Sequence, residues 1–593
     1  MRVAVSQFAT SLNIQENLAT CIRVLNKIAV CRPSLIVLPE FCNTQFCSFR
    51  SGYQDHNQAW DQALACDGVF LQTIAEQAKK HECYIVLNVT LRRDLIRDHQ
   101  DGAVKSSISV TSCIFSPQGK LIQEVGKQAL LGLEHNFFTS ENELAEAVTT
   151  PYGKLGLLSG NDSISFESSR ELSLAGAQLL CNPLSSFALD HSDLHSLSRA
   201  CENNVFLATA NKVGLLMPKS QSSQDAVSSM YSSISEDQLI GSGLSQIVSP
   251  DGKVLAKIAN NEEDFVFADI DLAEFGEGKL VGIHNKLRPD GTPLIKQLRP
   301  ELYLSKEQSL QHKQDLNVNR KVPVTANVAI FATFKTNEQA IEDVCFYIEN
   351  NLSDVIQLPE LFFVADKSLT HNAAQLESIA ELSRQFIEEV SAVLRPFQYV
   401  CTSLIIEGRH QAVLINEHGL LAKQAQLHFC KRYQWTPLGN DLNIVELPLE
   451  QGKINIAMLT ADDANVAEIV KVATANSIHL LLVPFDIQEP SEVEVSLLSR
   501  AAENRICIVA ATREKSFVDK VSNDTDGRSN TNKIKSKKST GLIANLTPDF
   551  GLLPQWKPGK FTGYINRPIV KHQYGKITKA LVYPIAACSK SLD

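Results

Sequence analysis

The chain has 593 residues, of which 44% are hydrophobic and 21% charged, the balance of an ordinary globular protein with room for two to four domains. Its net charge of −10 excludes the basic surface that nucleic-acid-binding proteins need. No run of about 18 apolar residues is free of charges and the N-terminus lacks a secretory pattern, so we expect no membrane span. The 14 scattered cysteines indicate reduced thiols in a cytoplasmic protein.

The first part of the chain alternates between strand-like and helix-like patterns. A strand is expected at residues 3–8, followed by a helix whose apolar face runs through 14–25. Residues 35–38 are apolar throughout, as a strand covered on both faces of its sheet needs to be. A helix near 68–80 and a second apolar strand at 84–87 follow. This order of strands and helices predicts an α/β fold.

The same rhythm begins again in the second half, which predicts an internal duplication. A strand is expected at 328–331, a helix at 338–348 and another apolar strand at 355–358. Two sequence blocks also recur in the same order. They are Leu38-Pro39-Glu40 with Leu358-Pro359-Glu360, and Ser198-Arg199-Ala200-Cys201-Glu202-Asn203 with Ser499-Arg500-Ala501-Ala502-Glu503-Asn504.

The repeat divides the chain into two domains and a connection. We expect the first domain at 1–285, a polar linker at 286–322 and the second domain at 323–593. Two polar inserts follow the repeated Arg-Ala-x-Glu-Asn block, at 217–238 and 514–539. Their composition cannot bury a core, so both are predicted to be mobile surface loops, and a contact of the second, basic insert with an anion or partner is the less favoured alternative.

The motifs of the first half resemble those of the nitrilase superfamily, the carbon–nitrogen hydrolases. Leu38-Pro39-Glu40 is similar to the strand end that carries the family's general base. The stretch from Gly119 to Lys127 is similar to the block that ends in its lysine, and Gly156 to Asp162 is similar to its cysteine-bearing strand. Within 286–322, the tail Arg299-Pro300-Glu301-Leu302-Tyr303 is similar to the family's C-terminal segment. The resemblance covers nearly the whole chain twice, and it implies tandem nitrilase-like α-β-β-α sandwich domains.

The resemblance also implies roles for the retained side chains of the first copy. Glu40 takes the position of the general base, Lys127 that of the oxyanion-stabilising lysine, and Glu134 that of a second, assisting glutamate. In the family these groups serve a cysteine thiolate that forms an acyl-enzyme. Asp162 is also retained, and with Ser159 it is a candidate ligand-binding residue.

The position of the nucleophile is the departure from the family pattern. Without gaps, Gly160 takes the place of the cysteine, and glycine has no side chain to form an acyl-enzyme. Ser159 is adjacent, but neighbouring strand residues face opposite sides, so its use as a nucleophile needs a local bulge. Cys42, Cys47 and Cys181 are other thiols near the pocket, and each is expected to be a small buried residue.

The second copy departs further from the family. Glu360 keeps the position of the base and is a candidate binding residue. Gln426 takes the place of the lysine, and Lys423 and Lys431 are alternatives that need a shifted alignment.

The nucleophile position of the second copy is Leu459 or Thr460. Because no cysteine is near and leucine there fills the pocket, this half is expected to be structural.

Neither a metal nor a cofactor is expected. The chain has no Gly-rich phosphate loop, dinucleotide fingerprint or metal-ligand cluster. His191 and His195 share the i, i+4 spacing of a metal pair, but a third ligand is missing, so both are expected to be surface residues.

Three functions therefore remain open. The favoured one is an inactive protein that binds a small carbonyl or carboxylate ligand or a protein partner. The second is an active hydrolase of a small amide, nitrile or carbamoyl compound that uses a replacement nucleophile or a water activated by Glu40. The third is a scaffold whose halves form a pseudo-dimer within one chain, or which forms a homo-oligomer. No contact with nucleic acid or membrane is expected.

Overall fold

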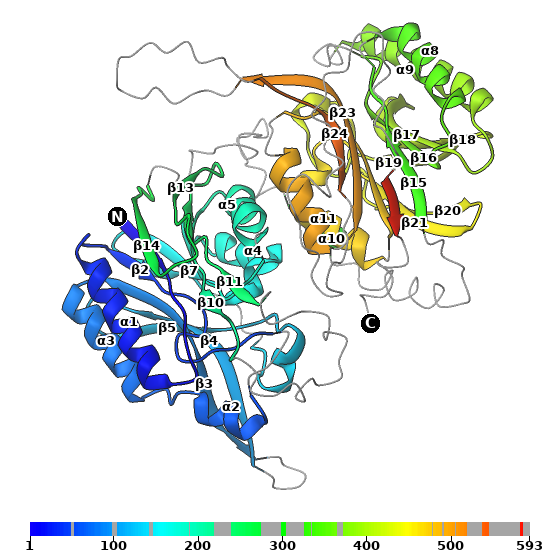
Figure 1. Cartoon of the computed structure of the whole chain (residues 1–593). Helices are drawn as coiled ribbons and strands as arrows, with labels where there is room; N and C mark the ends of the chain where they lie inside the picture. The colour runs from blue at the N-terminus through cyan, green and yellow to red at the C-terminus, as the bar shows by residue number, and fades with distance from the viewer. Residues whose placement is uncertain are drawn as a thin grey trace. The chain divides into compact units, whose positions relative to one another are not determined.

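The computed structural model has two compact units, one within Met1–His284 and the other beginning at Asn285 (Figure 1). The predicted α/β fold is confirmed in both, since each contains two large sheets with helices packed on them. Among the described residues, none of the helices combines the length and apolar character that a membrane span requires. The structure describes residues 1–48, 53–97, 104–141, 146–188, 190–218, 239–273, 298–303, 325–333, 335–364, 372–476, 478–488, 492–504, 506–518, 536–544 and 581–584.

The first sheet of the first unit is built from strands that are apolar on both faces. Val3 and Val5 face the core between the two sheets, whereas Ala4 faces the helices on the outer side. The three central strands are parallel and the others antiparallel. In sheet order the strands are β14 (Asp264–Asp269), β1 (Arg2–Gln7), β2 (Leu35–Val37), β3 (Tyr84–Arg97), β4 (Val104–Phe115) and β5 (Leu121–Gly126).

The second sheet of the first unit packs on the inner face of the first. Leu155, Leu179 and Phe206 join Val3 and Val5 in one buried core. The strands β7, β8 and β9 are parallel, so their carboxyl ends lie at the same edge. In sheet order the strands are β13 (Val254–Lys257), β12 (Gln246–Val248), β9 (Phe206–Ala210), β8 (Leu179–Pro183), β7 (Gly153–Leu157) and β6 (Val148–Thr150), and β10 (Val213–Leu215) pairs with β11 (Ile240–Ser242).

Helices cover the outer face of each sheet in this unit, which completes four layers (Figure 1). The predicted helices at 14–25 and near 68–80 are α1 (Ile14–Ala29) and α3 (Val69–His81), and both pack on the first sheet. Asn13 caps α1 by accepting from two backbone amides of its first turn. The remaining helices are α2 (His56–Gln62), α4 (Phe166–Leu174) and α5 (Ser196–Asn203).

The second unit repeats the strand order and strand directions of the first. Its first sheet again has three parallel central strands flanked by antiparallel ones. Its second sheet also places parallel strands at the centre. The strand orders are β25 (Leu581–Pro584), β15 (Thr325–Ile330), β16 (Val355–Glu360), β17 (Tyr399–Ile406), β18 (Arg409–Asn416) and β19 (Gly419–Ala425), then β20 (Ile444–Leu449), β21 (Gly452–Met458), β22 (Leu480–Pro484), β23 (Cys507–Val518) and β24 (Ser536–Ala544).

The helices of the second unit also occupy matching places in the chain. The predicted helix at 338–348 is α8 (Asn337–Glu349), which packs with α9 on the first sheet of this unit. This shared order supports the predicted duplication. The other helices are α6 (Pro300–Tyr303), α9 (Ala373–Val393), α10 (Ala467–Ala475) and α11 (Leu498–Asn504).

The prediction of a surface loop at 514–539 is wrong at both of its ends. The strand β23 continues to Val518, and β24 begins at Ser536, which pairs with Val518. A ladder between backbone groups needs no apolar side chain, so a lysine-rich segment forms it as well. The middle of this insert, most of the insert at 217–238 and most of the linker at 286–322 lie outside the described residues.

Candidate functional site

The turn after β7 holds the glycine at the predicted nucleophile position. Gly160 begins a short 3-10 helix, η2 (Gly160–Ser163), and has a φ of +54°, a left-handed conformation that favours glycine. A Cβ atom built on Gly160 would lie 2.1 Å from Oε1 of Glu40. The carboxylate of Glu40 therefore fills the space where a side chain at residue 160 would begin.

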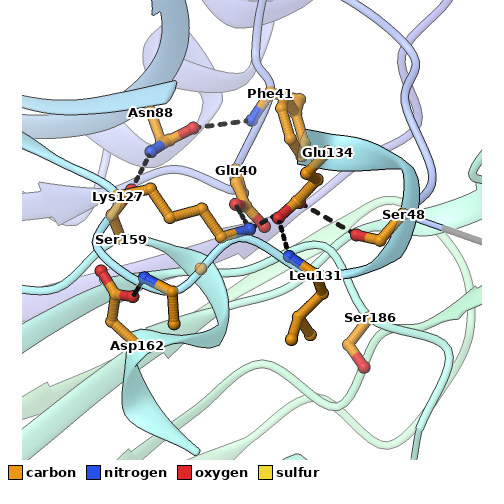
Figure 2. Close-up of polar contacts among 12 residues, drawn as sticks. Glu40, Phe41, Ser48, Asn88, Lys127, Leu131, Glu134, Ser159, Asp162 and Ser186 are labelled. Atoms are coloured by element: carbon orange, nitrogen blue, oxygen red, sulfur yellow. Dashed lines mark hydrogen bonds and ion pairs between the residues drawn. The ribbon is translucent and has the colours of Figure 1, made fainter. Parts of the chain in front are cut away.

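The three charged side chains predicted from the first copy lie together (Figure 2). Lys127 donates to Oε1 of Glu40 at 2.9 Å and to Oε1 of Glu134 at 2.7 Å. All three side chains are buried, so each ion pair acts in a medium of low polarity. Glu134 is fixed further by the Ser48 hydroxyl at 2.9 Å and the Leu131 amide at 2.8 Å.

Two buried lysines, Lys127 and Lys212, act on the carboxylate of Glu40, but burial outweighs them. Burial raises the pKa of Glu40 to about 7, with Lys127 opposing and Glu134 adding to the effect. The pKa of Lys127 is raised, because Glu134 and Glu40 together outweigh the burial that opposes it. Glu40 is therefore poised to gain or lose a proton near neutral pH, while Lys127 stays charged.

Asp162, predicted as a binding residue, has a structural task. Its two carboxylate oxygens accept the backbone amides of Ala129 at 2.7 Å and Gln128 at 3.1 Å. These are the residues directly after Lys127, so the aspartate fixes the loop that carries the lysine. Burial raises the pKa of Asp162 to about 6, against the opposing effect of these two amides.

The predicted alternative nucleophiles have other partners. The Ser159 hydroxyl accepts from the Asn88 side chain at 2.8 Å (Figure 2), which holds it within the buried polar cluster around Asn88. The Cys42 thiol donates to the Pro39 carbonyl at 3.0 Å. Burial raises the pKa of the Cys181 thiol to about 12, which disfavours the nucleophilic thiolate. Cys42, Cys47 and Cys181 are all buried, as predicted.

Several buried polar atoms around Glu40 have no hydrogen-bond partner. They are Oε2 of Glu40, Oδ1 of Asn182, Oγ of Ser185 and Nδ1 of His191. Asn182 lies beside the Gly160 turn, because its amide donates to Ser163, whose hydroxyl in turn bonds the Gly160 carbonyl. Ser185 follows Leu184, whose carbonyl accepts the Glu40 amide at 3.2 Å. Such atoms are costly to bury unpaired, so a cluster of them indicates a binding site.

The prediction that His191 and His195 lie on the surface is wrong. Each is only 3% exposed, and both belong to the π-helical turn η3 (His191–His195) that follows β8. Burial lowers the pKa of His191 to about 4, with the charge of Lys127 adding to the effect. The described residues contain no group of three or more His, Cys, Asp or Glu side chains arranged to hold a metal ion.

The strand register shows which residues of the second unit match this site. Leu158 donates its amide to the Cys181 carbonyl across β8, and Leu459 does the same to Leu482 across β22. Two residues further on, Ala461 has the same φ of +54° as Gly160. The prediction that Leu459 or Thr460 matches Gly160 is therefore wrong by one or two residues.

The matching aspartate confirms this register. Asp463 accepts the backbone amides of Leu427 and His428, as Asp162 accepts those of Gln128 and Ala129. Gln426 then matches Lys127, as the sequence alignment predicts. Its side chain donates to the His428 carbonyl at 2.8 Å and carries no charge.

The lysines considered as replacements in the second unit lie at the surface. Lys423 pairs with Glu407 at 2.9 Å, with both side chains exposed, and Lys431 is exposed as well. The cation at this site is Arg432, which sequence reasoning missed. Its guanidinium lies 3.5 Å from Glu360, and it also pairs with Asp462 at 3.2 Å and Asp486 at 3.8 Å.

Tyr433 is the second residue that sequence reasoning missed. It occupies the place of Glu134 in its 3-10 turn, η8 (Lys431–Tyr433), and its hydroxyl donates to Glu360. His410 stacks on its ring with centroids 3.9 Å apart, and Trp435 packs edge-on at 6.4 Å. Matching Gln426 to Lys127 through the contacts of Asp463 places Tyr433 at the position of Glu134. An alignment that searches for a lysine does not find this position.

A short segment from the predicted linker also contacts the second unit. Arg299 donates to the carbonyls of Leu427 and Gly439, and the Tyr303 hydroxyl lies 2.6 Å from Nε2 of His428. The segment 299–303 therefore packs beside Asp463 as part of this unit. These are the residues that resemble the family's C-terminal segment, and they fall in the unit that begins at Asn285.

Comparison with known proteins assigns the first unit to a family. Residues 2–280 match the carbon-nitrogen hydrolase family. A "hydrolase in pqqF 5′ region" of Pseudomonas protegens is 27% identical over 273 residues, covering 45% of this chain and 79% of that protein. A "probable nitrilase" of Schizosaccharomyces pombe is 26% identical over 270 residues, covering 44% of this chain and 84% of that protein. The structure of a Nesterenkonia amidase from the nitrilase superfamily has 20% sequence identity and a TM-score of 0.36, covering 46% of this chain and 92% of that one.

Residues 2–280 therefore form a carbon-nitrogen hydrolase domain of the nitrilase superfamily. The resemblance stated from the motifs of this half is confirmed. The family match ends at residue 280, so the membership of the second unit stays a prediction that its strand order supports.

Proposed function

We propose that the first domain binds a small carbonyl compound without forming a covalent intermediate. The observation that carries the proposal is the contact between Gly160 and Glu40, whose carboxylate stands where a nucleophilic side chain would begin. A glycine supplies no atom to attack a carbonyl carbon, and the adjacent Ser159 hydroxyl is bonded to Asn88. An acyl-enzyme therefore has no atom of attachment at this position.

The remaining groups suit the recognition of a polar ligand. Lys127 stays charged and is the natural donor to a carbonyl oxygen. Oε2 of Glu40 has no partner, and it accepts an N–H group when the carboxyl is ionised or donates when it is protonated. A ligand that pairs with these groups removes the cost of burying them alone, which supplies affinity.

An uncharged ligand fits the charge of the site better than a carboxylate. Lys127 is already paired with Glu134 and Glu40, and both oxygens of Asp162 accept backbone amides. A carboxylate ligand would add a further negative charge to this buried cluster, which is unfavourable. We therefore place amides ahead of carboxylic acids among the candidate ligands.

Hydrolysis through water is the second candidate, and the pKa of Glu40 favours it. A general base works best when its pKa is near the operating pH, and Glu40 has a pKa of about 7. General-base assistance alone contributes roughly 10²–10⁴-fold, against roughly 10⁶-fold or more for most enzymes. Any such activity would be slow.

We propose a structural role for the second unit. Glu360 is held by Tyr433 and Arg432, so its carboxylate already has partners within this unit. This arrangement leaves the candidate ligand site in the first domain.

Two measurements on the full chain test the proposal. The first is the shift in melting temperature with a panel of small amides, nitriles, carbamoyl compounds and carboxylates, and the second is ammonia release from the same panel. Glu40→Gln should abolish amide-induced shifts, whereas Glu262→Gln at an exposed position should keep them. Stabilisation without ammonia supports the binder.

Ammonia release that disappears in Glu40→Gln would establish the water-based hydrolase instead. If no compound shifts the melting temperature or releases ammonia, the first domain is not a binder of these compounds, and the scaffold remains.

A further inference from the structure

His191 is a buried side chain with an unused polar atom near the proposed ligand site. It begins the π-helical turn η3, a rare conformation that is frequent at functional sites. The side chain is 3% exposed, yet Nδ1 has no hydrogen-bond partner. The adjacent Asp190 also has one buried carboxylate oxygen, Oδ1, without a partner. Polar atoms that fold into such a place without protein partners are candidates for ligand contacts.

The second unit shows what position 191 faces. Glu492 begins the matching π-helical turn, η10 (Glu492–Leu497), and its carboxylate accepts from Asn465 at 3.1 Å and from the Gln488 amide at 2.7 Å. Asn465 ends the 3-10 turn η9 (Asp463–Asn465), two residues after Asp463. Position 492 therefore points at the turn that follows Ala461.

The corresponding partner is missing in the first unit. Ile164 stands two residues after Asp162, where the second unit has Asn465, and its side chain has no hydrogen-bonding atom. By this correspondence, position 191 faces the turn that begins at Gly160, and Nδ1 of His191 has no hydrogen-bond partner. The pKa of His191 is lowered by burial and in part by the charge of Lys127, which agrees with this placement.

We infer that His191 is a specificity-determining residue whose Nδ1 accepts an N–H group of the ligand held between Glu40 and Lys127. The imidazole is neutral, because burial and Lys127 both disfavour its protonated form. Oδ1 of Asn182, which lies beside the Gly160 turn and has no partner, is an acceptor as well. A site rich in acceptors selects ligands that donate, such as primary amides, over N,N-dialkyl amides and nitriles. The inference rests on the proposed binding function.

The test compares an amide that carries two N–H groups with its analogue in which methyl groups replace both hydrogens. Dissociation constants of a primary amide and its N,N-dimethyl analogue are measured calorimetrically for the full-length chain and its variants. Wild type should prefer the primary amide. His191→Leu should reduce that preference by roughly 5- to 100-fold, the range for a buried polar group left unpaired. His191→Asn keeps an acceptor near the same place and should retain part of the preference.

His195→Leu is the matched control, since His195 is equally buried on the same turn. It should lower stability while leaving the ratio of the two dissociation constants unchanged. An unchanged ratio in His191→Leu, with wild-type binding intact, overturns the role of His191. If that variant does not fold, an unchanged ratio in both His191→Asn and a His191→Gln variant has the same meaning.

Failure of the proposed function gives a different result. In that case neither ligand binds wild type, whereas failure of the present inference leaves wild-type binding intact. A ratio lowered equally in His195→Leu would show that the turn as a whole, and not His191, sets the preference.

Discussion

The two units place different chemistry on the same arrangement of strands and turns. In the first, Lys127 bridges Glu40 and Glu134, and polar atoms such as Nδ1 of His191 remain without partners. In the second, Arg432 and Tyr433 bond Glu360. The two carboxylates therefore differ in what holds them: a lysine shared with a second glutamate in the first unit, and an arginine and a tyrosine in the second. The comparison teaches that the same arrangement of strands and turns can hold a buried carboxylate with different partners.

The left-handed residue at the turn sharpens this difference. Ala461 has a Cβ atom where Gly160 has none, although both residues share a φ of +54°. The carboxylate of Glu360 in the second unit accepts a hydrogen bond from Tyr433, whereas the carboxylate of Glu40 in the first lies against Gly160. The direction of one carboxylate therefore separates the two sites.

The largest expected effect comes from removing the buried cation of the second unit. Arg432→Met leaves Glu360, Asp462 and Asp486 without their shared partner and should destabilise this unit by roughly 3–5 kcal/mol. Lys431→Met, one residue away at the surface, should change stability by less than about 0.5 kcal/mol. Urea denaturation monitored by circular dichroism measures both changes in stability. Equal effects would contradict the role of Arg432 as the shared partner of these three carboxylates.

Next is the insertion of one methyl group at the first turn. Gly160→Ala combines an unfavourable φ with a Cβ placed 2.1 Å from Glu40, and should cost roughly 2–5 kcal/mol. Gly408→Ala is the control, because Gly408 has a φ of +71° but nothing within 4 Å of the added atom. It should cost about 1–2 kcal/mol.

A second substitution isolates the contact itself. Glu40→Ala combined with Gly160→Ala should cost less than the sum of the single substitutions, since the carboxylate that opposes the methyl group is gone. Additive costs would show that Glu40 and Gly160 do not compete for the same space.

The pH dependence of stability should also differ when Glu40 is replaced. Its pKa is about 7 in the folded chain and near 4.5 when unfolded, so the folded state holds the extra proton between those values. Stability attributable to Glu40 therefore falls as pH rises through this window, by up to about 3 kcal/mol. The melting temperature should fall less between pH 5 and pH 7.5 in Glu40→Gln than in wild type. An identical fall would contradict the raised pKa of Glu40.

The smallest expected effect has the opposite sign. Ala461→Gly relieves a left-handed alanine and should stabilise the second unit by at most about 1–2 kcal/mol. The equivalent change cannot be made at Gly160, which is already glycine. Destabilisation in thermal melts would indicate that the methyl group of Ala461 packs well enough to outweigh its backbone strain.

The fold was predictable because its strands carry an apolar pattern that a helix or loop would not. Residues 35–38 are apolar on both faces, and they lie in a sheet between two buried layers. The strand β24 was not predictable in this way, since its first residues include lysines and its pairing depends on backbone groups of β23.

The first site was largely predictable, because Glu40, Lys127 and Glu134 stand in recognisable blocks and the structure brings all three together. The burial of His191 was not predictable from the sequence, since a histidine between polar residues has no pattern that distinguishes core from surface. The second site escaped prediction for a different reason. Arg432 and Tyr433 replace the family's charges at shifted positions, so an alignment by residue type finds the exposed Lys431 instead.

The edge-on contact of Trp435 with Tyr433 has an optical consequence. Trp435 lies in the second unit, while Trp60 lies in the first with the Arg92 guanidinium 5.4 Å from its ring. Indole emission depends on its surroundings, so each unit carries a fluorophore of its own. With Trp60 and Trp556 replaced by phenylalanine, the remaining emission would follow the loosening of the Glu360–Tyr433 network alone. The unfolding of the second unit could then be followed separately from that of the first within one chain.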